Sequence, residues 1–547
     1  MDKITRLSLI LIVLISFLVR FVGVTKNPPA LNWDEASIAY NAYSLLKTGR
    51  DEWGEFLPLH FRSYGEFKLP VQIYASIPAV ALFGLTDLGV RITPVVYGAL
   101  SVLLLYFVAY ELTKKQSIGV VSALLLALSP WHIHLTRASF ESSFSVFWVL
   151  FGTLFLLKGL ANKKYLILSS IPMALAVYTY NSARVFVPMF IFIFVALNIQ
   201  ELRKAKKYLV AMVAVFLLLL LPLVPFSLSG DVANRYKLVS IVDDPGLVPR
   251  IEEVRNNSGL PNLLNRTIHN RYTYVASTFL GNYLAHFTPD YLFLNGAPHK
   301  QHHAQGVGQM YLIQAPFILL GLYLLVKKKK KYGYVLVFWI LLAFVPVAIT
   351  RDSIPHALRT ILAVAPFQII TAYGFIESLK IVNSKNLKRF VVAAPFIILL
   401  FSFIKYQYNF FTYYPFKYSR DWQYGYKEVV QYIKDHYSEY DKIVFTRHYG
   451  EPHMFTLFYM GWDPNAYQND PNLNRFETFD WVRVLNFDKF YFPDLGDEGT
   501  KYQDVAAIYP NEKILFIGKP GDFPKKETLY EIRFLNGSLA FEIVEKI

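Results

Sequence analysis

Cysteine is absent from this chain of 547 residues, and charged residues are scarce. Without a thiol there is no disulfide, no thiolate metal site and no cysteine nucleophile. Asp, Glu, Lys and Arg make up 17% of the residues, while 54% are hydrophobic; an ordinary soluble domain has roughly 25% charged residues. Glycine patterns of the Walker or Rossmann kind are also missing. This composition excludes a disordered chain, a collagen-like fibre and an ordinary soluble enzyme.

Long apolar runs are abundant, and a membrane-spanning helix needs about 20 mostly apolar residues. The first run, 7–24, follows two basic residues and precedes the segment Lys-Asn-Pro-Pro (26–29). We interpret it as an uncleaved span, the alternative being a signal peptide. Ten further runs lie at about 92–111, 117–135, 140–158, 165–180, 184–199, 208–228, 309–326, 333–350, 357–377 and 389–406. The sequence therefore predicts a polytopic α-helical membrane protein with about 11 transmembrane helices.

The positive charge is unevenly distributed along the chain. Residues from 407 onward contain 16 Lys or Arg and 21 Asp or Glu, against 39 and 19 in residues 1–406. A nucleic-acid binder would be basic throughout, so no nucleic-acid partner is expected. Basic clusters at 114–115, 163–164, 203–207, 327–331 and 380–389 alternate onto one side of the predicted spans. The positive-inside rule then predicts a cytoplasmic N-terminus and an extracytoplasmic C-terminus, in a plasma or inner membrane.

Two domains follow from this topology. Residues 1–406 form the predicted transmembrane domain, with external loops 25–91 and 229–308, and residues 407–547 form an extracytoplasmic α/β domain. In the tail, hydrophobic periodicity predicts helices at 426–436 and 452–460. It predicts strands at 442–446, 489–492 and 513–517, followed by a hairpin of strands 529–534 and 539–544.

The first external loop carries the most informative residues. Asp34 and Glu35 come directly before an amphipathic helical pattern that ends near Gly49. One interpretation is helix capping, because an acid at a helix start satisfies free N–H groups and the helix dipole. The other is catalysis, with a carboxylate near the membrane surface that takes a proton from an acceptor hydroxyl.

A second acid lies close to a lysine further along this loop. Glu66 and Lys68 are two residues apart and precede Pro70, which favours the first turn of a helix. A solvated ion pair of little energetic value is one reading. The functional reading is that Lys68 holds a phosphate at the membrane interface, and that Glu66 positions substrate or a metal.

These two motifs resemble the GT-C type of polyprenyl-phosphate-sugar-dependent glycosyltransferases. The similar branches are the protein O-mannosyltransferases (dolichyl-phosphate-mannose-protein mannosyltransferases) and the aminoarabinose transferases. The family's Glu-Lys-Pro-Pro is here Glu66-Phe-Lys68-Leu-Pro70, and Ser37 stands where the aminoarabinose branch has Arg. The Trp-Trp-Asp motif of oligosaccharyltransferases is absent, which argues against transfer of a whole glycan.

Several arginines at the external ends of predicted spans are further candidates for substrate binding. Arg137 and Glu141 either face a cavity or pair at a helix end. Arg184 is either interfacial structure or a phosphate contact. Arg359, one turn into the tenth predicted span, is either a second phosphate ligand or half of a structural ion pair, since the planar guanidinium suits phosphate oxygens.

Histidines in the second external loop suggest hydrogen bonding to substrate. His302 and His303 lie in a segment that we expect to cover the sugar. Imidazole is also the commonest metal ligand, and some members of the family that this chain resembles use a divalent ion. Glu66 with His303 is therefore a candidate site for Mg, Mn or Zn.

The resemblance implies an inverting glycosyltransferase of the cell envelope, such as a mannosyltransferase acting in protein O-glycosylation. It would move one sugar from a polyprenyl-phosphate donor to a hydroxyl of a protein, lipid or glycan acceptor, with Asp34 as base and Glu35 orienting substrate. Membrane lipids are expected partners. The alternatives are a transporter or flippase for a lipid-linked sugar and a non-catalytic scaffold. Transporters often have two related halves, whereas the polar groups here gather on one predicted face.

Overall fold

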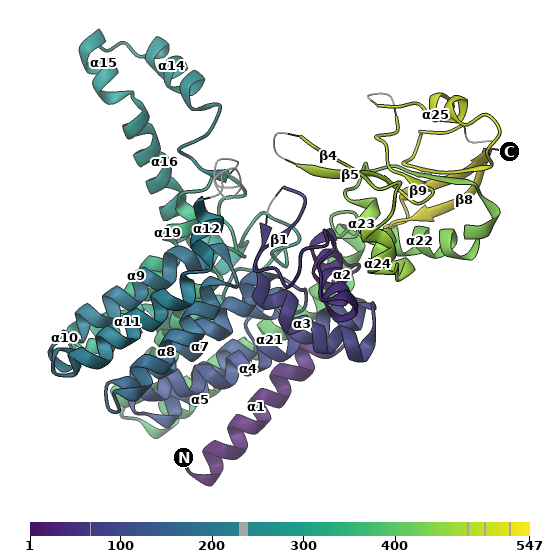
Figure 1. Cartoon of the computed structure of the whole chain (residues 1–547). Coiled ribbons are helices and arrows are strands. Elements are labelled where there is room, and N and C mark those ends of the chain that lie inside the picture. The colour runs from purple at the N-terminus through teal and green to yellow at the C-terminus, as the bar shows by residue number, and fades with distance from the viewer. Residues whose placement is uncertain (66, 229–238, 479–480, 497–498, 525–526, 547) are drawn as a thin grey trace. The chain divides into compact units, whose positions relative to one another are not determined.

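The computed structural model describes residues 1–65, 67–228, 239–478, 481–496, 499–524 and 527–546 (Figure 1). The chain forms two compact units. The helical unit comprises Met1–Arg20, Val95–Thr136 and Glu141–Gln407. The loop–tail unit comprises Phe21–Pro94, Arg137–Phe140 and Tyr408–Ile547. The first external loop therefore groups with the C-terminal tail.

Helices make up the helical unit, and some of them continue into the other unit. They are α1 Lys3–Phe21, α4 Asp87–Thr113, α5 Gln116–Ala127, α6 Pro130–Leu135, α7 Glu141–Gly159, α8 Lys164–Val177, α9 Asn181–Leu197, α10 Ile199–Leu202, η1 Arg203–Ala205, α11 Lys206–Leu220, α12 Leu223–Leu228, α14 Leu247–Asn257, α15 Asn262–Ile268, α16 Arg271–Ala285, η2 Asp290–Leu294, η3 Leu312–Gln314, α17 Ala315–Lys327, α18 Lys331–Ala343, α19 Val345–Ala348, η4 Ile361–Ala363, α20 Val364–Ile381 and α21 Lys385–Tyr418.

Each of the eleven predicted apolar runs contains a helix. Within the described chain, six helices are long and apolar enough to cross a membrane, or seven if the bent pair Asn181–Leu197 and Ile199–Leu220 is one span. The fold class is confirmed, and the number of crossings stays a prediction. The run 117–135 divides into α5 and α6, because the Ser129 side chain accepts a hydrogen bond from His132 N and Pro130 begins a new helix.

A buried arginine stabilises this break between α5 and α6. Arg20 of α1 donates from Nε to Thr136 Oγ1 at 2.9 Å and from Nη1 to the Ala127 carbonyl at 3.2 Å. Its Nη2 lies 2.8 Å from Nδ1 of His132. The carbonyls at the end of α5 have no partner within the helix, so Arg20 satisfies them and fixes α1 against α5 and α6.

The basic loops of this unit converge. Glu377, which is buried, pairs with Lys115 at 2.8 Å and with Lys328 and Lys380 at 2.6 Å. Near the N-terminus, Thr5 donates to the Gln116 side chain at 2.8 Å. Three of the five basic clusters and the N-terminus thus lie at one end of the bundle. The side of the membrane on which this end lies stays a prediction.

The first loop folds into two helices and a two-stranded hairpin, namely α2 Trp33–Thr48, β1 Phe61–Arg62, β2 Phe67–Lys68 and α3 Pro70–Phe83. Asn32 caps α2, and Gly49 ends it at φ +70°, a conformation that glycine adopts without strain. Strand β1 pairs antiparallel with β2, with Phe61 opposite Lys68. Helix α2 packs against α3 and against α23 of the tail.

A mixed sheet forms the centre of the described tail. Its seven strands have the order β4-β5-β6-β3-β7-β9-β8, and β3 runs parallel to both β6 and β7. The predicted α/β character is confirmed. The elements are α22 Tyr426–Asp435, η5 Tyr437–Glu439, β3 Lys442–Phe445, α23 Pro452–Met460, α24 Pro464–Gln468, β4 Asn474–Glu477, β5 Val482–Phe487, β6 Phe490–Tyr491, α25 Tyr502–Ile508, β7 Ile514–Gly518, β8 Thr528–Arg533 and β9 Leu539–Lys546.

Candidate active site

Asp34 and Lys68 form an ion pair in the loop–tail unit. Asp34 is the second residue of α2, and Lys68 ends β2. Lys68 Nζ lies 2.5 Å from Asp34 Oδ1. The side chain of Asp34 is 35% exposed, whereas that of Lys68 is 2% exposed. A carboxylate that solvent can reach is thus held by an almost fully buried ammonium group.

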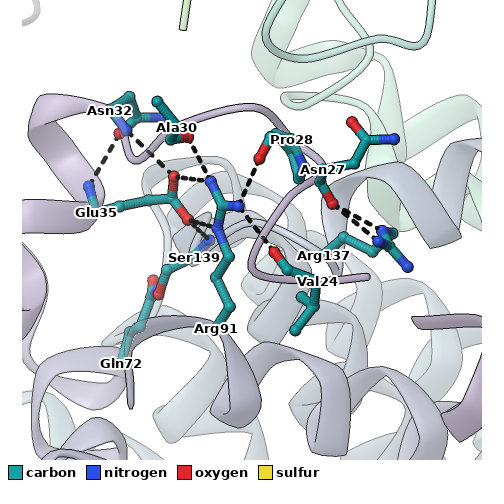
Figure 2. A network of polar contacts seen from close by, with 10 residues as sticks. All are labelled: Val24, Asn27, Pro28, Ala30, Asn32, Glu35, Gln72, Arg91, Arg137 and Ser139. Atoms are coloured by element: carbon teal, nitrogen blue, oxygen red, sulfur yellow. Dashed lines mark hydrogen bonds and ion pairs between the residues drawn. The ribbon is translucent and has the colours of Figure 1, made fainter. Parts of the chain in front are cut away.

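Glu35 has a different environment, which Figure 2 shows. It is fully buried, and Arg91 donates to Oε1 from Nε and to Oε2 from Nη2, both at 3.0 Å. Glu35 Oε1 also accepts from Ser139 N at 3.0 Å, and Oε2 accepts from Asn32 N at 3.2 Å. With Asn32 it completes a capping box at the start of α2. The helix-capping interpretation therefore describes Glu35, and the exposed carboxylate is Asp34.

The same arginine fixes the segment that leads into α2. Arg91 Nη1 donates to the carbonyls of Val24 at 2.9 Å and Pro28 at 2.7 Å, and Nη2 donates to that of Ala30 at 2.5 Å (Figure 2). Five donor groups of a buried guanidinium need this many acceptors. Arg91 was missing from the predicted site residues. The feature of the sequence that could have identified Arg91 is its position as a charged residue at the start of an otherwise apolar span.

Arg137 has a similar structural environment. It is buried, donates to the Asn27 carbonyl from Nη2 at 2.8 Å, and lies 5.0 Å from the centre of the Phe411 ring. Nearby, Gln72 Nε2 donates to Ser139 Oγ at 2.6 Å. Arg137 thus contacts the backbone before α2, and Gln72 positions the Ser139 segment that binds Glu35.

Aromatic side chains gather beside Asp34. The Trp33 ring centre lies 6.0 Å from that of Tyr64 and 6.1 Å from that of Trp481. Tyr64 donates from its hydroxyl to the Trp33 carbonyl at 3.0 Å, and Trp481 donates from Nε1 to Glu451 at 2.6 Å. Trp481 begins the segment that enters β5, so the tail contributes an aromatic ring to the surroundings of the α2 start.

Two buried carboxylic acids near these aromatic rings, Glu52 and Glu451, have raised pKa values. Burial raises the pKa of Glu52 to about 7, although hydrogen bonding from Asn41 lowers it. Burial likewise raises the pKa of Glu451 to about 7, opposed by the hydrogen bond from Trp481. Desolvation disfavours a carboxylate. Both groups therefore titrate near neutral pH.

Glu141 and Arg184 belong to the helical unit. Glu141 is the first residue of α7, and its charge interacts with the guanidinium of Arg184 near the start of α9. Nε and Nη2 of Arg184 are buried and have no hydrogen-bond partner among the described residues. These N–H groups are available to donate hydrogen bonds to an anionic ligand.

Arg359 occupies an ion pair in this structure. Its Nη2 lies 3.1 Å from Asp352 Oδ2, and Nη1 donates to Thr350 Oγ1 at 2.9 Å. This is the structural alternative considered for Arg359. Its role as a phosphate ligand stays a prediction.

Of the two loop histidines, His303 is buried and His302 is half-buried. His303 Nε2 donates to the Val307 carbonyl at 2.6 Å, and Gln309 donates to His303 Nδ1 at 3.3 Å. Burial lowers the pKa of His303 to about 4. His302 stacks on His299 with ring centres 3.7 Å apart, and burial lowers its pKa strongly. Both histidines therefore pack the loop interior.

The predicted metal site of Glu66 and His303 is only partly described, and it stays a prediction. Both ring nitrogens of His303 already have hydrogen-bond partners, and Glu66 lies outside the described residues. No group of three His, Cys, Asp or Glu side chains that could hold a metal ion occurs in the described ranges.

The predicted site residues thus fall into two sets. Asp34, Glu35, Lys68 and Arg137 lie in the loop–tail unit, and the first three cluster around the start of α2. Glu141, Arg184, His302, His303 and Arg359 lie in the helical unit.

Comparison with known proteins agrees with the resemblance seen in the sequence. Residues 70–226 match the model of the dolichyl-phosphate-mannose-protein mannosyltransferase family. Comparison with curated protein sequences gives no match. The matched stretch runs from α3 into α12.

Solved structures share the fold at low sequence identity. ArnT from Cupriavidus metallidurans bound to undecaprenyl phosphate matches with a TM-score of 0.52 and 11% identity, over 98% of each chain. The archaeal oligosaccharyltransferase AglB from Archaeoglobus fulgidus, in complex with an inhibitory peptide and a dolichol-phosphate, matches with a TM-score of 0.50 and 14% identity. That match covers 87% of this chain and 62% of the archaeal one, so the chain spans less than two thirds of its length. The chain therefore has the GT-C fold of membrane glycosyltransferases.

Proposed function

We propose that the protein is a polyprenyl-phosphate-dependent glycosyltransferase that moves a single sugar to an acceptor hydroxyl with inversion at the anomeric carbon. The observation that carries this proposal is the Asp34–Lys68 pair, an accessible carboxylate beside a buried ammonium. The fold and the family match support the enzyme class. The lipid phosphates bound to ArnT and AglB support the donor class.

Asp34 acts as the general base in this proposal. The acceptor oxygen attacks the anomeric carbon, its proton passes to Asp34, and the bond from that carbon to the phosphate oxygen breaks. The polyprenyl phosphate leaves with the bonding electrons. A base must lie within hydrogen-bond reach of the proton that it removes. The partly exposed carboxylate of Asp34 is open to an acceptor, whereas Glu35 is fully buried.

Lys68 binds the donor phosphate. Its ammonium moves from Asp34 to the phosphate when the donor binds, which frees Asp34 Oδ1 to accept the hydroxyl proton. A cation at the leaving phosphate stabilises the charge that develops there in the transition state. Glu35, held by Arg91, sets the position of Asp34 as a positioning residue.

Within the helical unit, Arg184 is the best candidate for contact with a lipid phosphate, because two of its donors are buried without a hydrogen-bond partner in the described residues. Arg359 would have to leave Asp352 to play that part. The aromatic rings near Asp34 provide apolar surface for the acceptor. The catalytic side is extracytoplasmic in this proposal, because the basic loops, which favour the cytoplasmic side, gather at one end of the helical bundle.

Purified protein and a panel of radiolabelled polyprenyl-phosphate sugars test the proposal. We expect release of polyprenyl phosphate from one donor, with the sugar transferred to an added acceptor at the opposite anomeric configuration. Binding of the donor without consumption would support the transporter or flippase alternative.

A further inference from the structure

A helical hairpin in the second external loop projects from the bundle of the helical unit. It comprises residues 247–285, which form α14, α15 and α16. Figure 1 shows the three helices extending away from the bundle, with α15 near their far end. We call these residues the outer hairpin.

The base of the outer hairpin is fixed to the end of a candidate span. Asn282 Nδ2 donates to the Thr350 carbonyl at 2.7 Å, and the Tyr283 hydroxyl donates to the Leu341 carbonyl at 2.9 Å. Leu341 lies within the apolar helix pair Lys331–Ala348, and Thr350 follows it by two residues. The last turns of α16 therefore contact this candidate span and the residues that directly follow it.

The far end of the outer hairpin exposes large apolar side chains on one face. Leu263, which is 81% exposed, Leu264 and Ile268 share one side of α15, and exposed Leu260 lies just before this helix. On the opposite side, Asn265 is buried and donates from Nδ2 to the Arg255 carbonyl at 2.8 Å. The polar side of α15 therefore packs against α14, while no element of the described chain covers its apolar side, which is exposed.

Apolar exposure continues from this end towards the bundle. On α16, Tyr272 is 85% exposed, and Leu280 and Leu284 are also exposed. Asn282 and Tyr283 of the same helix contact the span end. Exposed apolar side chains are therefore present at both ends of α16.

The charges of the outer hairpin complement an anionic surface. Residues 247–285 contain four arginines and two glutamates, and no lysine or aspartate. A helix with an apolar face, arginines at its polar face and an aromatic residue at the boundary is typical of a segment that lies in a membrane interface. Apolar patches of this kind are unfavourable in water.

From these observations we propose that the outer hairpin lies on the phospholipid surface at this end of the spans. Leu260, Leu263, Leu264 and Ile268 insert among the acyl chains next to the headgroups. Arg266, on the polar side of α15, faces anionic headgroups. The proposal is independent of the chemistry assigned to Asp34.

The absence of cysteine from the chain gives a clean test. Leu263→Cys and, as matched control on the exposed polar side of the same helix, Asn262→Cys each receive a nitroxide label. The labelled full-length proteins are reconstituted in lipid discs of mixed zwitterionic and anionic phospholipid. Relaxation by oxygen, which concentrates in lipid, is compared with relaxation by a water-soluble nickel chelate.

We expect the label at position 263 to be more accessible to oxygen than to the chelate, and the label at 262 to show the reverse. Leu264→Cys should behave like Leu263→Cys, which guards against a local effect of one substitution. Equal chelate access at 262, 263 and 264 would overturn the proposal. Shielding of 263 from both reagents would also overturn it, because it would indicate a protein partner.

Discussion

Glu35 and Arg91 form a two-point ion pair in which both side chains are fully buried and both contacts measure 3.0 Å. Arg91 also binds the backbone before α2, and Glu35 caps that helix. The pair therefore connects the start of α4, the incoming segment and α2 in one rigid unit. This rigidity sets where the neighbouring Asp34 lies.

Arg91→Met should strongly destabilise the protein, because it leaves the Glu35 carboxylate buried without a counter-charge. Loss of one partner of a buried pair costs about 3–5 kcal/mol. Thermal unfolding in detergent measures the effect, with exposed Arg203→Met as control. The double variant Glu35→Met with Arg91→Met should recover part of the loss. A double variant no more stable than the single one would show that the two charges are not coupled.

Lys68→Met should weaken binding of the donor more than binding of the acceptor. A charge-assisted hydrogen bond contributes about 1.5–3 kcal/mol, so we expect KM for the donor to rise by about 10- to 100-fold. Initial rates at varied donor concentration measure this. Lys47→Met, in the last turn of α2 and exposed, should leave KM unchanged. An unaltered KM in Lys68→Met would remove Lys68 from the phosphate site.

Arg184→Gln tests the unused donors in the helical unit. Removal of a guanidinium that binds phosphate should reduce donor affinity by about 10-fold or more. Equilibrium binding of radiolabelled polyprenyl phosphate measures the change, and Arg203→Gln serves as the control. Because the assay needs no turnover, it separates binding from catalysis. Equal affinity in Arg184→Gln and wild type would assign Arg184 a structural role.

Glu451 should make stability depend on pH. Its folded pKa of about 7 lies above the ordinary value of 4.5, so the folded state binds the proton more tightly than the unfolded state. Stability is therefore greatest below pH 4.5 and falls as the pH rises to about 7, by about 3 kcal/mol for this group. The melting temperature of Glu451→Gln should fall less between pH 5 and pH 8. An identical pH profile in both proteins would contradict the assignment.

The sequence predicted the membrane class and most tail elements because apolar periodicity and length determine them locally. Strand β3, helices α22 and α23, and the final hairpin β8–β9 lie where they were expected. Strands β4 and β5 were missed. They carry Arg475 and Arg483 and are mostly half-buried or exposed, so their alternation is weak.

The candidate site was only partly predictable for a similar reason. Asp34, Glu35 and Lys68 lie in short motifs, and a motif shows which residues are near in sequence. Glu35 is buried and Asp34 is accessible because Arg91 and Ser139, which are distant in sequence, bind Glu35. The pairing of Arg359 with Asp352 likewise depended on the local loop conformation.

Transfer by Asp34→Asn beside wild type tests the central claim most directly. With purified protein, labelled polyprenyl-phosphate sugar and an acceptor, loss of a general base should lower kcat by about 10²–10⁴-fold. Donor binding should be retained, because Lys68 is still present, and Asp504→Asn, exposed in the tail, should transfer at the wild-type rate. Near-normal transfer by Asp34→Asn would contradict the account.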